Sequence, residues 1–228
     1  GQKEIVITGI NTGDFGHTTG ERFIDLLRAL DKVEGIERYR ISSIEPNLIT
    51  DEIIEFCSSS PRFMPHFHIP LQSGSTHILG LMRRRYTADK YRERIAKIRE
   101  LMPDSFLGVD VIVGFPGEGE AEFMETYRLL EEVEASFLHI FPFSERPGTP
   151  AVTMPNKVQS SISTERVSRL EELSNRLHNS FANRYLNTTR KVLFESTVKD
   201  GIMFGYTDNY LRVKAQYDAS QINHICNV

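Results

Sequence analysis

The sequence of 228 residues is poor in cysteine, contains no tryptophan and has no long apolar run. Cys57 and Cys226 are too few for a disulfide framework and lack the close spacing of a zinc or iron–sulfur motif, so both are interpreted as small buried residues. The apolar runs are as long as a buried strand, roughly 4 to 8 residues, and far shorter than the roughly 20 that span a bilayer. No charged-then-apolar signal peptide opens the sequence, so we expect a soluble, cytoplasmic protein with no membrane partner.

An excess of positive charge is also missing. The chain has 27 Lys and Arg against 31 Asp and Glu, a formal net charge of -4, which argues against a surface coated in basic residues. A local basic patch could still hold an RNA backbone, so net charge does not decide the partner. With 39% hydrophobic residues, the chain can bury one sizeable core and a small appendage.

The chain does show repeated switching between strand and helix periods, which is typical of βα units around a parallel sheet. We expect five strands, at 3–8, 39–44, 66–71, 106–113 and 137–143. Between them we expect helices that begin at a Thr18–Glu21 capping box, at a Thr50 cap, near Thr87 and near Glu120. These patterns predict an α/β fold.

A Pro- and Gly-rich linker at 146–150 ends this alternation. A long helix is expected over 163–186, and after Arg190 the pattern predicts only strands, at 191–198, 203–207 and 210–217, with turns at 200–201 and 208–209. This gives three predicted regions: 1–155, 156–189 and 190–228. The last is too short to be expected to fold alone.

Polar and glycine-rich segments follow all five predicted strands. In parallel βα architectures the reactive groups lie after the carboxyl ends of the strands. One such turn is usually only a turn, but five in register favour a shared site. Glycine permits close approach of the backbone, and amide, hydroxyl and carboxylate groups can bind ribose hydroxyls and an amino-acid head group. A nucleotide with a zwitterionic tail fits this chemistry. The segments are GINTG from Gly9, SIEP from Ser43, PLQSG from Pro70, GFPGE from Gly114 and FPFS from Phe141.

Together these segments resemble the radical S-adenosylmethionine (SAM) methylthiotransferases of the MiaB and RimO type. The matching stretches are SSIEP at 42–46, HIPLQSGS at 68–75, MRRRYT at 82–87, DVIVGFPGE at 110–118 and PFSERPGTPA at 142–151. The segments GINTGD and SIEP are most similar to the branch that modifies threonylcarbamoyladenosine beside the tRNA anticodon. The resemblance implies a partial, open radical SAM βα-barrel (TIM-barrel-like) at 1–155, its long last helix at 156–189 and a small, β-rich, incomplete TRAM-like RNA-binding segment at 190–228.

The resemblance also implies an activity. Such enzymes use SAM, 4Fe-4S clusters and an electron-supplying reductant to add a methylthio group to tRNA. They hold the first cluster with a CxxxCxxC loop, and this chain contains neither that motif nor the three cysteines for a second cluster. We therefore expect a part of a longer enzyme that is inactive alone. Gly119 stands where many relatives have threonine.

Site residues follow from the resemblance. It places Asn11, Ser43, Glu45 and Gln72 against SAM, with Arg84 as a charge partner. Asp110 and the backbone of Gly114, Pro116 and Gly117 would shape the adenosine side, and Phe141 and Phe143 would flank the adenine. In the TRAM-like segment the candidate phosphate contacts are Arg190, Lys191, Lys199, Arg212 and Lys214. No catalytic residue and no metal ligand is assigned.

Structural interpretations compete with these assignments. Arg83–Arg85 could be a solvated helix face, Asp110 a buried cap, and the two phenylalanines plain core residues. His66 and His68 lie on one side of a strand, but no third metal ligand is near in sequence.

Two other functions remain open from the sequence. A cluster-free βα-barrel lyase would need a catalytic lysine on a strand, and no strand core offers a convincing one. A non-catalytic RNA-binding module would use the barrel only as a support for the C-terminal segment.

Overall fold

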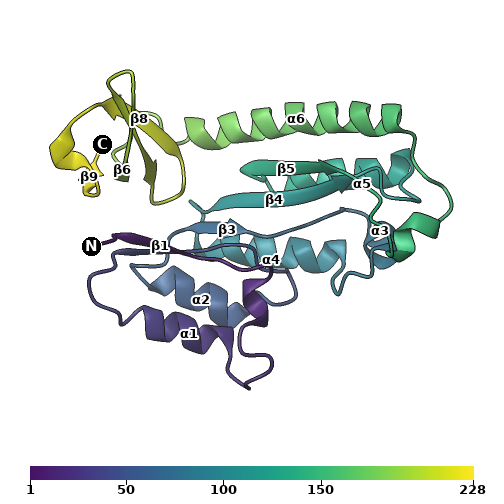
Figure 1. The fold of residues 1–228 in the computed structure, drawn as a ribbon, viewed down its shortest axis with the longest axis horizontal. Helices are drawn as coiled ribbons and strands as arrows, with labels where there is room; N and C mark the ends of the chain where they lie inside the picture. Colours follow the sequence, from purple (N-terminus) through teal and green to yellow (C-terminus); the bar gives the residue numbers. More distant parts are fainter.

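The computed structural model describes residues 1–228 and shows a larger α/β part and a small C-terminal sheet at the far end of a long helix (Figure 1). The predicted mixed α/β class and the five strands in its larger part are confirmed. No helix combines the length and the apolar character needed to cross a membrane. The elements are β1 (Glu4–Ile7), α1 (Phe23–Leu30), β2 (Arg38–Ile41), α2 (Asp51–Ser59), β3 (His66–His68), α3 (Thr76–Leu81), α4 (Ala88–Leu101), β4 (Phe106–Val113), α5 (Glu120–Glu132), β5 (Phe137–Pro142), α6 (Ser160–Asn183), β6 (Lys191–Lys199), β7 (Ile202–Thr207), β8 (Arg212–Gln216) and β9 (Ile225–Asn227), with 3-10 turns at Thr12–Asp14, Pro150–Thr153 and Ala219–Gln221.

The strands of the larger part are parallel and follow one another in chain order. β1 pairs with β2, and β3, β4 and β5 form a second ladder. A parallel bridge between Ser43 and His68 joins the two ladders, where the Ile44 N–H donates to the His68 carbonyl oxygen at 3.1 Å. β1 and β5 each have one neighbour, so the sheet is open and no closed barrel forms. All five carboxyl ends therefore lie at the same edge.

The two faces of this sheet differ in polarity. Phe67, Val109 and Leu138 point to the helices and are buried in the main core. Because side chains alternate along a strand, the residues between them lie on the opposite, inner face. That face carries charged and imidazole groups, namely Arg38, Arg40, His66, His68, Asp110 and His139. Parallel sheets are usually apolar on both faces. The polarity of the inner face therefore indicates a role other than packing in the core.

Buried Arg40 connects this inner face to the C-terminal sheet. Its side chain is 1% exposed, and its Nε donates to Glu4 Oε1 at 2.9 Å. The two terminal nitrogens donate to the carbonyl oxygens of Thr207 and Asp208, both at 2.8 Å. Arg38, also buried, donates to two more carbonyl oxygens of the same sheet. The C-terminal sheet is therefore docked against the amino ends of β1 and β2.

Some local predictions were wrong. The Thr18 capping box does not form: α1 begins at Phe23 without a side-chain cap, and the Thr19 hydroxyl donates instead to the Glu21 carboxylate at 2.7 Å. Gly20, with a φ of 81°, turns the chain before the helix begins.

Two elements were not expected from the sequence. These are α3 and β9, the latter paired antiparallel with β6. The long helix begins three residues earlier than expected, at Ser160, and ends at Asn183. The third strand ends at His68, before Pro70 and before Gln72, which has a φ of 65°.

Replacing Arg40 tests the docking of the C-terminal sheet. Arg40→Ala leaves the Glu4 carboxylate and two carbonyl oxygens without their buried donor, so we expect a loss of about 3–5 kcal/mol in the free energy of unfolding. Arg28→Ala removes exposed ion pairs to Asp25 and Glu52 and should cost less than about 1 kcal/mol. Urea denaturation measures both. Equal small losses would contradict the docking role of Arg40.

Candidate functional site

A cleft of about 630 Å³ opens at the carboxyl ends of β4 and β5. Its volume lies within the range typical of small-molecule sites. Five predicted site residues line it together, although they come from four separate segments of the chain: Gln72, Arg84, Asp110, Phe141 and Phe143. The Phe141 side chain is 51% exposed, so it is not a core residue.

Gln72 is held in the cleft by its backbone. Its φ of 65° is unusual for a residue other than glycine. The Gln72 N–H donates to the Asp110 carbonyl oxygen at 2.8 Å, and its own carbonyl oxygen accepts from the Ile112 N–H at 2.9 Å. Because β4 satisfies the backbone, the amide side chain remains available for a ligand.

Arg84 connects the cleft to the loops after β1 and β2. It forms an ion pair with Glu45 at 3.3 Å, and both side chains are about a quarter exposed. The Glu45 N–H in turn donates to the Asn11 side-chain oxygen at 3.2 Å. The Ser43 carbonyl oxygen accepts from Thr12 at 3.0 Å. Asn11, Ser43 and Glu45 are thus brought together beside the cleft, but they do not line it.

The glycine-rich loop after β4 is held in place by Glu118 and by Arg166 of α6. The Gly114 N–H donates to Glu118 Oε1 at 3.0 Å, and the same oxygen pairs with Arg166 of α6 at 2.7 Å. Burial raises the pKa of the Glu118 carboxyl, against the opposing effect of the Gly114 N–H and Arg166. A Cβ on Gly114 would lie 2.2 Å from the Ser163 hydroxyl oxygen. Gly114, Pro116 and Gly117 do not line the cleft, so their role toward adenosine stays a prediction.

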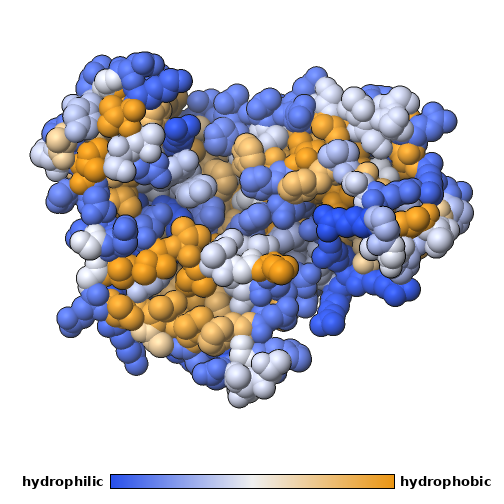
Figure 2. All heavy atoms as spheres, viewed as in Figure 1, coloured by the Kyte–Doolittle hydropathy of each residue, from blue (hydrophilic) through white to orange (hydrophobic).

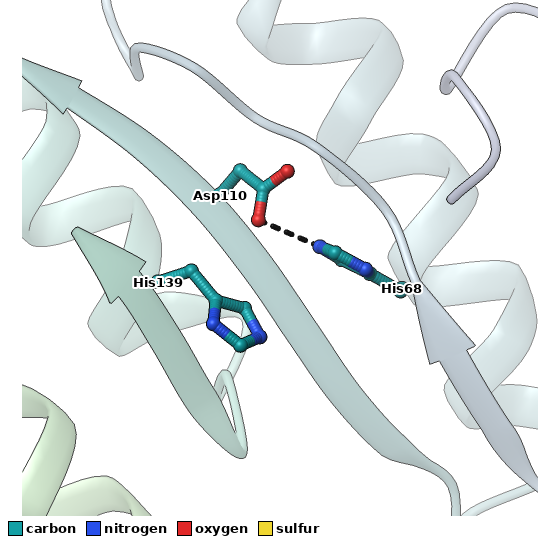
Figure 3. A group of neighbouring side chains, drawn as sticks. All are labelled: His68, Asp110 and His139. Carbon is teal, nitrogen blue, oxygen red and sulfur yellow. Dashed lines mark hydrogen bonds and ion pairs between the residues drawn. The ribbon is translucent and has the colours of Figure 1, made fainter. Parts of the chain in front are cut away.

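Asp110 also meets two histidines on the inner face of the sheet (Figure 3). Its Oδ1 lies 2.6 Å from Nε2 of His68, and the rings of His68 and His139 are 5.2 Å apart between centroids. Burial lowers the pKa of His139, and neighbouring His68 lowers it further. Asp110 is therefore not an isolated buried acid. Sequence reasoning missed His139, whose only signal was its place between Phe137 and Phe141 on the same face of β5.

A second, larger cavity of about 810 Å³ lies between the inner face, α6 and the C-terminal sheet. Four of the seven histidines line it: His66, His68, His139 and His178. Burial lowers the pKa of His66 to about 3, so this imidazole is neutral near pH 7. The cavity lies toward the amino ends of the strands, whereas ligands of such sheets bind at the carboxyl ends. The smaller cleft is therefore the better candidate for the cofactor.

The predicted phosphate contacts of the C-terminal sheet differ in availability. Arg190 is engaged by Asp104 and Asp208, both at 2.9 Å. The other four are exposed, namely Lys191, Lys199, Arg212 and Lys214. Phe204 pairs with Lys214 and Tyr206 with Arg212 in the β7–β8 ladder. Because paired residues share a face, this face carries basic and aromatic groups together.

The cysteines of this chain do not fit an iron–sulfur cluster. Cys57 is buried in α2, whereas Cys226 lies in β9 of the C-terminal sheet, and both are free. Burial raises the pKa of Cys57 to about 12, which keeps it a thiol when cluster ligands must be thiolates. Residues 1–228 therefore contain no set of ligands for such a cluster.

Similarity to known proteins agrees with this arrangement. The radical SAM superfamily model matches residues 1–130. Threonylcarbamoyladenosine tRNA methylthiotransferase MtaB of Bacillus subtilis is 44% identical over 234 residues, 100% of this chain and 52% of the relative. The tRNA-2-methylthio-N(6)-dimethylallyladenosine synthase of Acetivibrio thermocellus is 38% identical over 232 residues, 100% of this chain and 48% of the relative. The chain thus spans about half the length of these curated relatives.

A solved structure gives the same fold. Coproporphyrinogen III oxidase of Escherichia coli, a radical SAM enzyme, superposes with a TM-score of 0.58 over 77% of this chain and 40% of its own. At 14% identity this likeness concerns the fold alone. The family match covers more than half of the chain. The chain belongs to the radical SAM superfamily.

Proposed function

We propose that this chain is the cofactor-binding and substrate-positioning part of a tRNA methylthiotransferase that acts on threonylcarbamoyladenosine next to the anticodon. The observation that carries this proposal is the 44% identity to the Bacillus subtilis MtaB across the whole chain. The whole enzyme would work in the cytoplasm, with 4Fe-4S clusters and a reductant. Residues 1–228 contribute no cluster ligand, so we expect this chain to be inactive alone.

The cleft offers groups that complement SAM. Membership of the superfamily implies SAM and a 4Fe-4S cluster as cofactors, and SAM supplies the adenosyl and methyl groups of the reaction. Arg84 lines the cleft and can bind the carboxylate of its methionine end, while Glu45, which pairs with Arg84 beside the cleft, would bind the ammonium group. The exposed ring of Phe141 offers a face for the adenine. The task of this chain is to hold the reacting groups in position and exclude water.

The C-terminal sheet supports an RNA-binding role, as expected of a TRAM-like segment. One face of this sheet combines Lys199, Arg212 and Lys214 with Phe204 and Tyr206, and its Tyr206 and Arg212 also line the 810 Å³ cavity. The Arg212 guanidinium lies 4.4 Å from the centre of the Phe204 ring, which holds its charge above the sheet. Basic groups that bind phosphates and aromatic rings that stack on bases are the usual means of binding single-stranded RNA. The C-terminal sheet would thus bind the tRNA while the open α/β part presents the cofactor.

The rival functions receive less support. A Schiff-base lyase needs a lysine in the sheet, and none of β1–β5 contains one. A purely RNA-binding module would retain the basic face but would have no use for the Glu45–Arg84 pair beside the cleft. Cofactor binding therefore separates the proposed function from that module.

Arg84→Met tests the cleft. Loss of the charge partner should weaken binding of SAM, or of the unreactive S-adenosylhomocysteine, by about tenfold, the usual effect of losing an interaction worth about 1.4 kcal/mol. Arg85→Met is the matched control, because exposed Arg85 does not line the cleft. Isothermal titration calorimetry on the purified chain measures both variants. Equal affinities would remove Arg84 from the site, and no binding by the unchanged chain would contradict the assignment of the cleft.

The double variant Lys199→Ala, Lys214→Ala tests the C-terminal sheet. We expect weaker tRNA binding and a salt dependence of log K reduced by roughly one for each lysine that contacted a phosphate. Lys32→Ala, an exposed lysine beyond α1, should leave both unchanged. Filter binding across a series of salt concentrations gives the slopes. A double variant with the slope of the unchanged chain would show that RNA does not use this face.

A further inference from the structure

The inner face of the sheet brings together three groups that bind metal ions in other proteins. His68 of β3, Asp110 of β4 and His139 of β5 come from three adjacent strands and point to the same side (Figure 3). One ligand atom from each lies within 4.8 Å of the other two. Two imidazoles and one carboxylate are a ligand set that suits zinc and other divalent first-row metals.

The spacing of these atoms is close to that of a coordination sphere. Ligand atoms at about 2.0–2.2 Å from a zinc ion lie roughly 3.3 Å apart in a tetrahedral site. The His68 Nε2 to Asp110 Oδ1 distance of 2.6 Å is shorter, and the remaining pairs lie within 4.8 Å. To admit an ion, the His68 and Asp110 side chains would have to rotate apart. No shift of the backbone is needed, because the three strands are fixed by parallel pairing.

The three groups have few competing partners. The Asp110 carboxylate hydrogen bonds only to His68, and His139 makes no side-chain hydrogen bond, whereas His178 in the same cavity bonds to the Ser136 carbonyl oxygen at 3.1 Å. Burial lowers the pKa of His139, so its ring is present as the neutral imidazole that binds metals.

The position of the cluster leaves part of a coordination sphere open. His68 and His139 line the 810 Å³ cavity, while Asp110 lines the 630 Å³ cleft. Three protein ligands with access to a cavity are typical of catalytic rather than structural metal sites, which keep a position for water or substrate. No carboxylate or carbonyl group accepts a hydrogen bond from the second ring nitrogen of His68 or His139. Metal binding is therefore expected to be weaker than at a site whose histidines have such hydrogen bonds.

We propose that His68, Asp110 and His139 form a site for one divalent first-row metal ion such as Zn²⁺, whose open position faces the cavity. The site uses residues of this chain alone and shares Asp110 with the cleft of the proposed function, but its test measures metal binding without methylthiotransferase activity. It differs from any iron–sulfur site, because no cysteine takes part.

Metal titration of the chain, freed of metal with a chelator, tests the proposal. Co²⁺ is the spectroscopic probe, because its visible absorption reports coordination by nitrogen and oxygen, and Zn²⁺ is titrated by calorimetry. We expect one equivalent to bind, with His139→Gln and Asp110→Asn weakening the affinity at least about tenfold. His178→Gln is the matched control: it removes an imidazole of the same cavity outside the cluster and should change the affinity less than about twofold.

A loss of metal binding can be distinguished from a loss of folding in these variants. His139 is exposed, so His139→Gln should keep the circular dichroism spectrum and urea midpoint of the metal-free parent. A folded His139→Gln chain that binds Zn²⁺ as tightly as the parent would overturn the site. So would failure of the parent to bind, or equal losses in His139→Gln and His178→Gln.

Discussion

The polar inner face of an otherwise buried parallel sheet is the constraint on which the rest of this structure depends. Arg38 and Arg40 cannot remain without partners in the protein interior, because an unpaired buried charge costs several kcal/mol. Backbone carbonyl oxygens of the C-terminal sheet satisfy them at the amino ends of the strands. That sheet therefore cannot cover the carboxyl ends, and the 630 Å³ cleft stays open there.

Helix α6 runs along the α/β part from the loops near the cleft to the C-terminal sheet (Figure 1). Near its start, Arg166 forms a buried pair with Glu118, which also accepts from the Gly114 N–H in the loop beside the cleft. Near its end, Phe181 packs with Phe106 and Leu211 beneath the docked sheet. One rigid helix thus fixes both the loop after β4 and the position of the proposed RNA-binding face. Figure 2 shows several separate apolar patches on this face, the largest at lower left over the region of β1, α1 and α2.

The sequence was informative where the spacing of apolar residues is regular and where family motifs occur. Strand–helix alternation predicted the five parallel strands, and the family resemblance pointed to Gln72, Arg84, Asp110 and both phenylalanines, which line one cleft. It failed where partners are distant in sequence. Asp110 and His139 are 29 residues apart and meet only through the β4–β5 register. The docking role of Arg40 depends on carbonyl oxygens about 167 residues away, for which composition carries no signal.

The same limit explains why a metal site was not expected. His66 and His68 share a strand face, yet His66 stacks with Phe106 and Tyr210 under the docked sheet, where burial keeps it neutral. His68 instead turns to Asp110, whose carboxylate also lines the cleft. An ion held by His68, Asp110 and His139 would place a positive charge between the cleft and the histidine-lined cavity. Binding in either space would then depend on the charge at Asp110, because this one residue borders the cleft and contacts the cavity wall.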